Sequence, residues 1–258
     1  MGTRNSWQVQ KSVIYALFLR EVNVRFSAGK LGYFWVIFEP LLQVFIFVAV
    51  KVMLFGTTSS LDYPVFITLG FVGFNFFRHV VDQSMGAFAA NKGLYAYKQV
   101  KPIDTIISRV LVEFLVTSII VFIFVLFGSY FGFDMNVQNL GILLLSFIWL
   151  ALFAIGFGLF TAVLSTFYDS LKKVIKLILS PLMFVSAVFY AMQDMPQGLQ
   201  DLIYYNPLAH FMELLHSSYF FILNDDFVDY TYMLLWTIIP LYIGLWSYSR
   251  LEKRIISL

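Results

Sequence analysis

Residues 137–167 read VQNLGILLLSFIWLALFAIGFGLFTAVLSTF and contain no charged side chain. A helix needs about 20 mainly apolar residues to cross the hydrocarbon core of a bilayer, so this run is long enough to span a membrane. Five further runs of this kind occur, and the six together are Leu31–Val50, Tyr63–Ala89, Ile103–Phe131, Val137–Phe167, Val174–Met192 and Tyr230–Tyr248. The sequence therefore predicts an all-α membrane protein with six transmembrane helices in a single domain, residues 1–258.

The composition supports the membrane class. Of the 258 residues, 60% are hydrophobic and 12% are charged, whereas a soluble domain carries about 25% charged residues. Such a chain cannot cover a water-facing surface of normal size. The absence of cysteine excludes disulfides, zinc–thiolate sites and iron–sulfur clusters.

The order of the charges predicts the orientation. No Lys or Arg occurs between Lys176 and Arg250, although six acidic residues fall there. Short basic segments of membrane proteins stay in the cytoplasm. We therefore expect both termini to be cytoplasmic and the acidic segment to lie outside.

Two segments differ from the spans. In residues 1–30, apolar positions from Val13 to Val24 alternate with Arg20, Glu21 and Arg25, which predicts an amphipathic helix in the membrane interface. A soluble helix packed on a partner is the alternative. Between spans one to five (31–192) and span six with its cytoplasmic tail (227–258), residues 193–226 contain polar groups that are costly in lipid. We expect a re-entrant periplasmic hairpin there, broken at Asn206-Pro207.

Motifs for nucleotide, metal or hydrolytic chemistry are absent. Gly29-Lys30 lacks the preceding glycine and the following hydroxyl of a phosphate-binding loop, and no H-E-x-x-H or G-x-S-x-G occurs. We expect no catalytic residue, no metal site and no cofactor in this chain, and no nucleic-acid partner.

Charged residues inside the predicted spans are costly and therefore informative. Arg78 and Asp82 share a helix face, as do Arg109 and Glu113, and Glu39 precedes Pro40 in the first span. They form either ion pairs between helices, with Glu39 as a further member, or a polar lining for a hydrophilic substrate. Because aromatic rings stack on the apolar faces of sugars, such a lining would include rings as well. The candidate channel residues are Phe34, Trp35, Phe38, Glu39, Arg78, Asp82, Phe184, Phe189 and Tyr190.

The basic loop from Ala90 to Pro102 has two interpretations. It is either a positively charged loop that only sets the orientation, or a short docking helix for a cytoplasmic motor.

Five stretches of the chain resemble a known family. They are FLRE at 18–21, LGYFWVIFEP at 31–40, ANKGL at 90–94, VKPIDTII at 100–107 and NPL at 206–208. The chain is similar to the KpsM/BexB/CtrC group, the permease subunits of capsular polysaccharide exporters of the ABC-2 type.

The resemblance implies an ATP-driven exporter of lipid-linked capsular polysaccharide in a Gram-negative inner membrane. It implies a homodimer and a separate KpsT-like ATPase dimer that binds ATP and magnesium. It also implies a periplasmic polysaccharide co-polymerase and an outer-membrane export protein as further partners. The implied ATPase-docking residues are Arg20, Glu21, Asn91, Lys92, Gly93, Leu94, Tyr95, Tyr97, Lys98 and Lys101.

Two other functions stay open at this point. One is an ABC-2 permease for a different substrate, such as O-antigen, teichoic acid, another lipid or a small drug. The other is a secondary transporter that works without an ATPase, for which an inverted repeat would be the sign. The sequence shows no such repeat.

Overall fold

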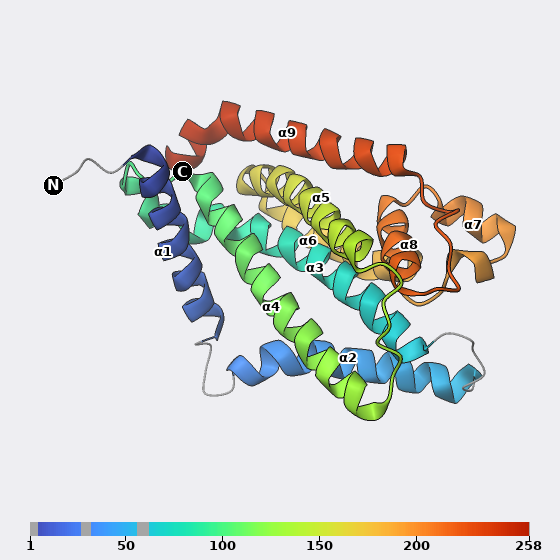
Figure 1. Ribbon diagram of the computed structural model, residues 1–258. Helices are drawn as coiled ribbons and strands as arrows, with labels where there is room; N and C mark the ends of the chain where they lie inside the picture. Colours follow the sequence, from blue (N-terminus) through green and yellow to red (C-terminus); the bar gives the residue numbers. More distant parts are fainter. Residues whose placement is uncertain (1–4, 27–31, 56–61, 258) are drawn as a thin grey trace.

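The computed structural model describes residues 5–26, 32–55 and 62–257, and within them it contains helices and no strand (Figure 1). The all-α prediction is thus confirmed for these ranges. The expected boundary between the interfacial segment and the first span, at residues 30 and 31, lies outside them, as does the Gly29-Lys30 pair. The α-helices are α1 Ser6–Phe26, α2 Gly32–Phe55, α3 Tyr63–Ala90, α4 Pro102–Phe131, α5 Leu140–Phe167, α6 Asp169–Leu182, α7 Gln197–Ile203, α8 Pro207–Tyr219 and α9 Tyr230–Ser257, and the short 3₁₀ helices are η1 Lys92–Ala96, η2 Met183–Val185 and η3 Met192–Asp194.

Three of the described helices, α3, α4 and α5, are long and apolar enough to cross a membrane. They contain 28, 30 and 28 residues, which at about 1.5 Å per residue exceeds the roughly 30 Å of a bilayer core. Their bounds agree with three predicted spans to within three residues. The other three predicted spans fall on α2, α6 and α9, whose place in a membrane stays a prediction.

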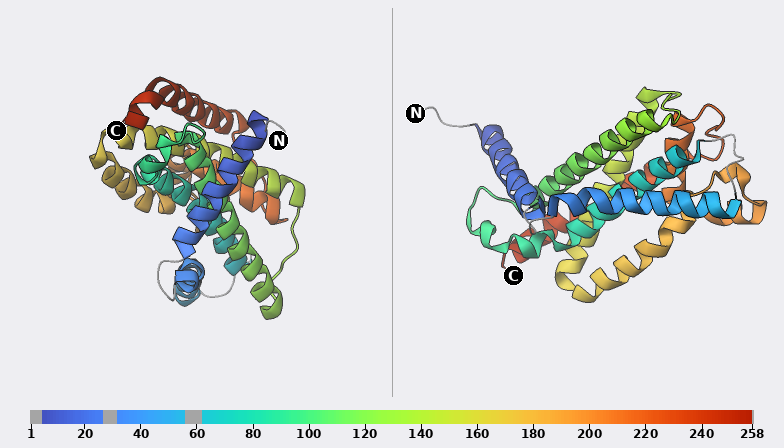
Figure 2. Two further views of the ribbon diagram at one scale, coloured as in Figure 1. Left: turned by 90° about the vertical axis from the view of Figure 1, so that its left-hand side faces the viewer. Right: turned by 90° about the horizontal axis from the view of Figure 1, so that it is seen from below.

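The helices are arranged around α3 and α5 (Figures 1 and 2). α5 packs along both α9 and α3, α4 packs on α3, and α1 packs on α4. The start of α1, the end of α9 and η1 lie at one end of the molecule, whereas α7 and α8 lie at the other end. The fold therefore separates the basic segment after α3 from the acidic segment before α9.

α5 and α9 pack closely against each other. A Cβ atom built on Gly156 would lie 2.7 Å from the backbone nitrogen of Leu241, and one on Gly244 would lie 3.1 Å from the carbonyl oxygen of Gly156. The Trp149 indole also donates a 2.9 Å hydrogen bond to Thr237 Oγ1 across this contact. Small residues let the two backbones approach, as is typical of helix pairs in membranes.

The predicted fifth span, Val174–Met192, is not one continuous helix. α6 ends at Leu182 and η2 at Val185, and the following backbone is irregular, with a left-handed φ of 54° at Ala187. The Asn206 side chain donates 2.9 Å hydrogen bonds to the Val185 carbonyl and to Ser186 Oγ. The Asn206 side chain, distant in the sequence, thus provides a hydrogen bond to a backbone carbonyl that a continuous helix would have bonded internally.

The segment after η3 forms two short helices that are separated at Asn206-Pro207, as the sequence predicts. Asn206 caps α8 by accepting a 3.0 Å hydrogen bond from Leu208 N–H, and Pro207 occupies the first turn. α8 is buried from Leu208 to Tyr219. His216 stacks on Phe66 at 3.8 Å between ring centroids, and its Nε2 lies 3.1 Å from the Phe66 carbonyl. Because α8 packs on α3 and α5, its polar groups are enclosed by protein; whether the hairpin enters a membrane stays a prediction.

Candidate functional site

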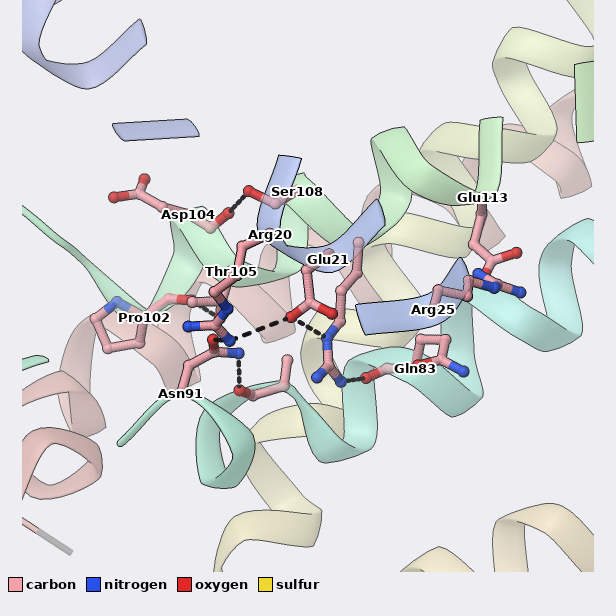
Figure 3. A network of polar contacts seen from close by, with 12 residues as sticks. Arg20, Glu21, Arg25, Gln83, Asn91, Pro102, Asp104, Thr105, Ser108 and Glu113 are labelled. Carbon is pink, nitrogen blue, oxygen red and sulfur yellow. Dashed lines mark hydrogen bonds and ion pairs between the residues drawn. The ribbon is translucent and has the colours of Figure 1, made fainter. Parts of the chain in front are cut away.

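Polar side chains attach α1 to the C-terminal half of α3 and the N-terminal half of α4 (Figure 3). Arg20 donates to Asn91 Oδ1, and Asn91 in turn donates a 2.8 Å hydrogen bond to the Ala87 carbonyl. Glu21 accepts from Arg109 Nε at 3.2 Å. Three docking candidates, Arg20, Glu21 and Asn91, therefore hold helices together in this chain, and Asn91 is buried.

A second attachment of α1 is deeper in the fold. Arg25, in the last turn of α1, forms an ion pair with Glu113 of α4, and His79 Nδ1 of α3 lies 3.6 Å from the other oxygen of the same carboxylate. The side chain of Glu113 is only 1% exposed. One buried carboxylate thus connects three helices.

A polar cavity of about 240 Å³ lies beside this ion pair, between the end of α1 and helices α2, α3 and α4. Its charged and amide lining residues are Arg25, Glu39, Gln43, Asn75, Arg78, His79, Asp82 and Gln83. A second cavity of about 230 Å³ shares Arg25 and Gln83 with the first and reaches Glu21 and Arg109. Together, the two cavities extend from the polar contact of α1 to the space between α2, α3 and α4.

The ion pairs join different helices, as one of the two interpretations of the sequence expected, but the partners are not those that the i, i+4 spacing offers. Asp82 pairs with Lys176 of α6 at 2.8 Å rather than with Arg78, and the partner of Arg109 is Glu21 rather than Glu113. Glu39 does not join these pairs; its carboxylate lies 3.5 Å from the Gln43 amide. Within the described ranges, Arg78 has no ion-pair or hydrogen-bond partner.

The aromatic channel candidates form two clusters along α2. Near its start, Phe34 stacks on Phe38 at 4.7 Å, and Trp35 lies 5.8 Å from Phe38, edge to face. Farther along, the ring centroid of Phe47 lies 4.6 Å from that of Phe189 and 6.5 Å from that of Phe184.

Tyr190 lies next to the second aromatic cluster and donates a 3.1 Å hydrogen bond to the Phe184 carbonyl. Glu39 and Gln43 of the polar cavity stand between the two clusters in the sequence of α2. From Phe38 to Phe47 the distance along the helix is about 14 Å, at about 1.5 Å per residue.

The segment after α3 divides into buried and exposed residues. Tyr95 is buried, with its hydroxyl 3.4 Å from Thr105 Oγ1, and burial raises the pKa of its phenol. Leu94 is half-buried. The docking candidates that face outward are Lys92, Gly93, Tyr97, Lys98 and Lys101.

The sequence missed several residues of this site. In the sequence, Arg25 belongs to the predicted interfacial helix, Lys176 only marks the start of the segment without basic residues, and Phe47 is one of several aromatic residues in the first predicted span. Spacing within one helix carries no sign of these contacts, because each partner belongs to another helix. The i, i+4 rule describes neighbours on one helix face and says nothing about a neighbouring helix.

Comparisons with known proteins agree with this architecture. Residues 12–220 match the ABC-2 type transporter family. The chain is similar to the polysialic acid transport protein KpsM of Escherichia coli, with 31% identity over 98% of this chain and 99% of that protein. It is also similar to the capsule polysaccharide export inner-membrane proteins CtrC of Neisseria meningitidis (28% identity; 96% and 94% covered) and BexB of Haemophilus influenzae (27% identity; 88% and 85% covered).

These matches extend over most of each chain, and they confirm the resemblance that the five sequence stretches indicated. The protein therefore belongs to the ABC-2 type transporter family.

Proposed function

We propose that the chain is the membrane permease subunit of an ATP-driven exporter that moves lipid-linked capsular polysaccharide across the inner membrane. The observation that carries this proposal is the similarity to KpsM, a polysialic acid transport protein, over nearly the whole of both chains. The chain is a transport subunit and not an enzyme.

The order of side chains along α2 supports a path for sugars. An aromatic cluster, a polar cavity and a second aromatic cluster follow one another along the helix. Rings stack on the apolar faces of sugars, and the polar groups between them bind hydroxyls. A moving polymer needs several weak sites rather than one strong site, because each binding step must be followed by release.

A second copy of the chain completes the path in this proposal. α2 and η2 contribute candidate channel residues, yet Phe34, Trp35 and Phe184 are more than half exposed in the single chain. In the homodimer, the two copies of these helices face a shared channel. Each copy has six spans, and the α7–α8 hairpin is re-entrant from the periplasmic side.

The basic end of the molecule faces the cytoplasm in this arrangement, with both termini there, in a Gram-negative inner membrane. A KpsT-like ATPase dimer binds ATP and magnesium and docks on the exposed part of residues 92–101. Its motion reaches α1 through the Arg20–Asn91 contact and α4 through Glu21 and Arg109. The opposite end meets the periplasmic co-polymerase, which leads to the outer-membrane export protein.

Deletion of the gene tests the proposed function. We expect loss of surface capsule, accumulation of polymer inside the cell, and restoration by the wild-type gene only when the ATPase is active. Normal capsule with lost O-antigen or teichoic acid would assign a different ABC-2 substrate. Polymer transport by the purified chain in liposomes, driven by an ion gradient without an ATPase, would assign a secondary transporter.

Charge reversal of Lys98 and Lys101 tests the docking surface. The double variant Lys98→Glu, Lys101→Glu is expected to insert normally but to lose most capsule export, because both side chains are exposed and their reversal removes the positive charge of the docking surface. Export is measured as surface polymer, and assembly as co-purification with the ATPase. Lys253→Glu, an exposed lysine near the end of α9, is the matched control. Normal export and co-purification of the double variant would remove the docking assignment.

A further inference from the structure

Not every charge around the polar cavity is paired with an opposite charge among the described residues. Arg25 and His79 share Glu113, and Asp82 is paired with Lys176. Glu39 is exposed and lies beside the Gln43 amide. Arg78 faces the same cavity, is half-buried and has no partner among the described residues. A cation at this depth of a membrane protein is costly unless an anion or water compensates it.

The cavity is large enough for a ligand group. Its volume of about 240 Å³ is well above the roughly 10–15 Å³ that one water molecule needs. Asn75 and Gln43 add neutral amide donors to the wall that contains Arg78. A guanidinium with nearby amide donors is suited to an oxyanion, because its planar fork donates two parallel hydrogen bonds to two oxygens.

We propose that this cavity binds one oxyanion, a carboxylate or a phosphate, through Arg78. The inference deepens the proposed function and rests on it for the source of the anion, which is either an acidic sugar of the polymer or the phosphate of its lipid anchor. Binding itself is a property of the cavity and does not require transport.

The opposing explanation is internal. Glu39 borders the same cavity, and if its carboxylate pairs with Arg78 in solution, no site for a ligand is left. In that case Arg78 and Glu39 form an ion pair that stabilises the protein. The exchange Glu39→Arg with Arg78→Glu then restores the thermal stability that either single substitution removes.

The test measures the thermal stability of the full-length protein in detergent during titration with four probes. Oligogalacturonate supplies carboxylates and dextran is its neutral counterpart, whereas phosphatidylglycerol supplies a phosphate anion and phosphatidylcholine is its zwitterionic counterpart. We expect stabilisation by at least one anionic probe and not by its counterpart. Stabilisation by oligogalacturonate identifies the sugar as the source, and stabilisation by phosphatidylglycerol identifies the lipid anchor.

Variants assign the effect to the cavity. Arg78→Gln is expected to lower the affinity for the stabilising probe at least about tenfold, because a charged hydrogen-bond donor is lost. Arg78→Lys is expected to lower this affinity less. Arg250→Gln, which removes an exposed arginine stacked 5.1 Å from the Trp246 ring, should bind as the wild type does. If Arg78→Gln does not fold, the titration of Arg78→Lys alone decides whether Arg78 binds the anionic probe.

Three results would overturn the inference. One is equal probe binding by the wild type and the Arg78 variants, and another is no stabilisation by either anionic probe. The third is full restoration of the thermal stability of the protein by the Glu39–Arg78 exchange. Capsule export by the wild type is scored separately. An absent anion site with normal export leaves the proposed function standing, whereas anion binding without capsule export would refute the proposed function alone.

Discussion

Replacing Arg25 by methionine is expected to destabilise the protein by about 3 kcal/mol, near the lower end of the 3–5 kcal/mol for a broken buried ion pair. The methionine keeps most of the apolar stem but leaves the Glu113 carboxylate, 1% exposed, with only His79 at 3.6 Å. The measurement is unfolding of the purified protein in detergent. Because Arg25 is a main attachment of α1, we also expect reduced capsule export.

Two further variants separate the ion pair from a general effect of removing a cation. Arg25→Met combined with Glu113→Leu should recover most of the lost stability, because no buried charge is then left alone. Lys172→Met likewise removes the cation of an ion pair, in which Lys172 Nζ lies 2.8 Å from Asp169 Oδ1, but the side chain of Asp169 is 90% exposed. An exposed pair contributes about 0–1 kcal/mol, so this control should stay close to wild type. An Arg25→Met loss no larger than that of Lys172→Met would contradict the buried attachment.

Replacing Gly156 by alanine is expected to cost about 1–3 kcal/mol, the usual penalty for adding a methyl group where no space exists. The new Cβ would lie 2.7 Å from the Leu241 nitrogen and 2.9 Å from its Cα. Both atoms belong to the backbone, so α9 itself must move away from α5. A lower unfolding temperature and a lower yield of inserted protein are the expected observations.

The other glycines give an ordered comparison for this effect. Gly244→Ala should cost less than Gly156→Ala, because its Cβ would meet atoms at 3.1 Å rather than 2.7 Å. Gly198→Ala in α7, where a Cβ meets nothing within 4 Å, should cause no loss. If all three variants have the same unfolding temperature as the wild type, the close approach of α5 and α9 is not present in the protein.

The sequence predicted the apolar helices well because a membrane span is a local property. The ends of α3, α4 and α5 follow from where the apolar runs stop, and α4 begins at Pro102, whose missing N–H suits the first turn of a helix. The break between α7 and α8 at Asn206-Pro207 was also predictable, since capping by asparagine and the fixed φ of proline act within a few residues.

The candidate site was predictable only in its residue types. That Asp82 and Glu113 would be paired followed from the cost of charge in an apolar environment. Which cation each would pair with did not follow, because Lys176 and Arg25 lie far away in the sequence. Likewise, Pro181 is compatible with a kinked helix as well as with a helix end, and the end at Leu182 did not follow from it because the compensating hydrogen bonds come from Asn206.

By itself, the sequence determined the helical membrane class, the extent of the main apolar helices, the separation of basic and acidic segments and the family. Each of these depends on composition and on interactions within about one helix turn or one apolar run. The tertiary structure alone decided the attachment of α1, the end of α6, and the cavity in which Arg78 has no partner among the residues that the structure describes. These depend on distances between helices, and an ion pair or a cavity forms only where packing brings residues from different helices together.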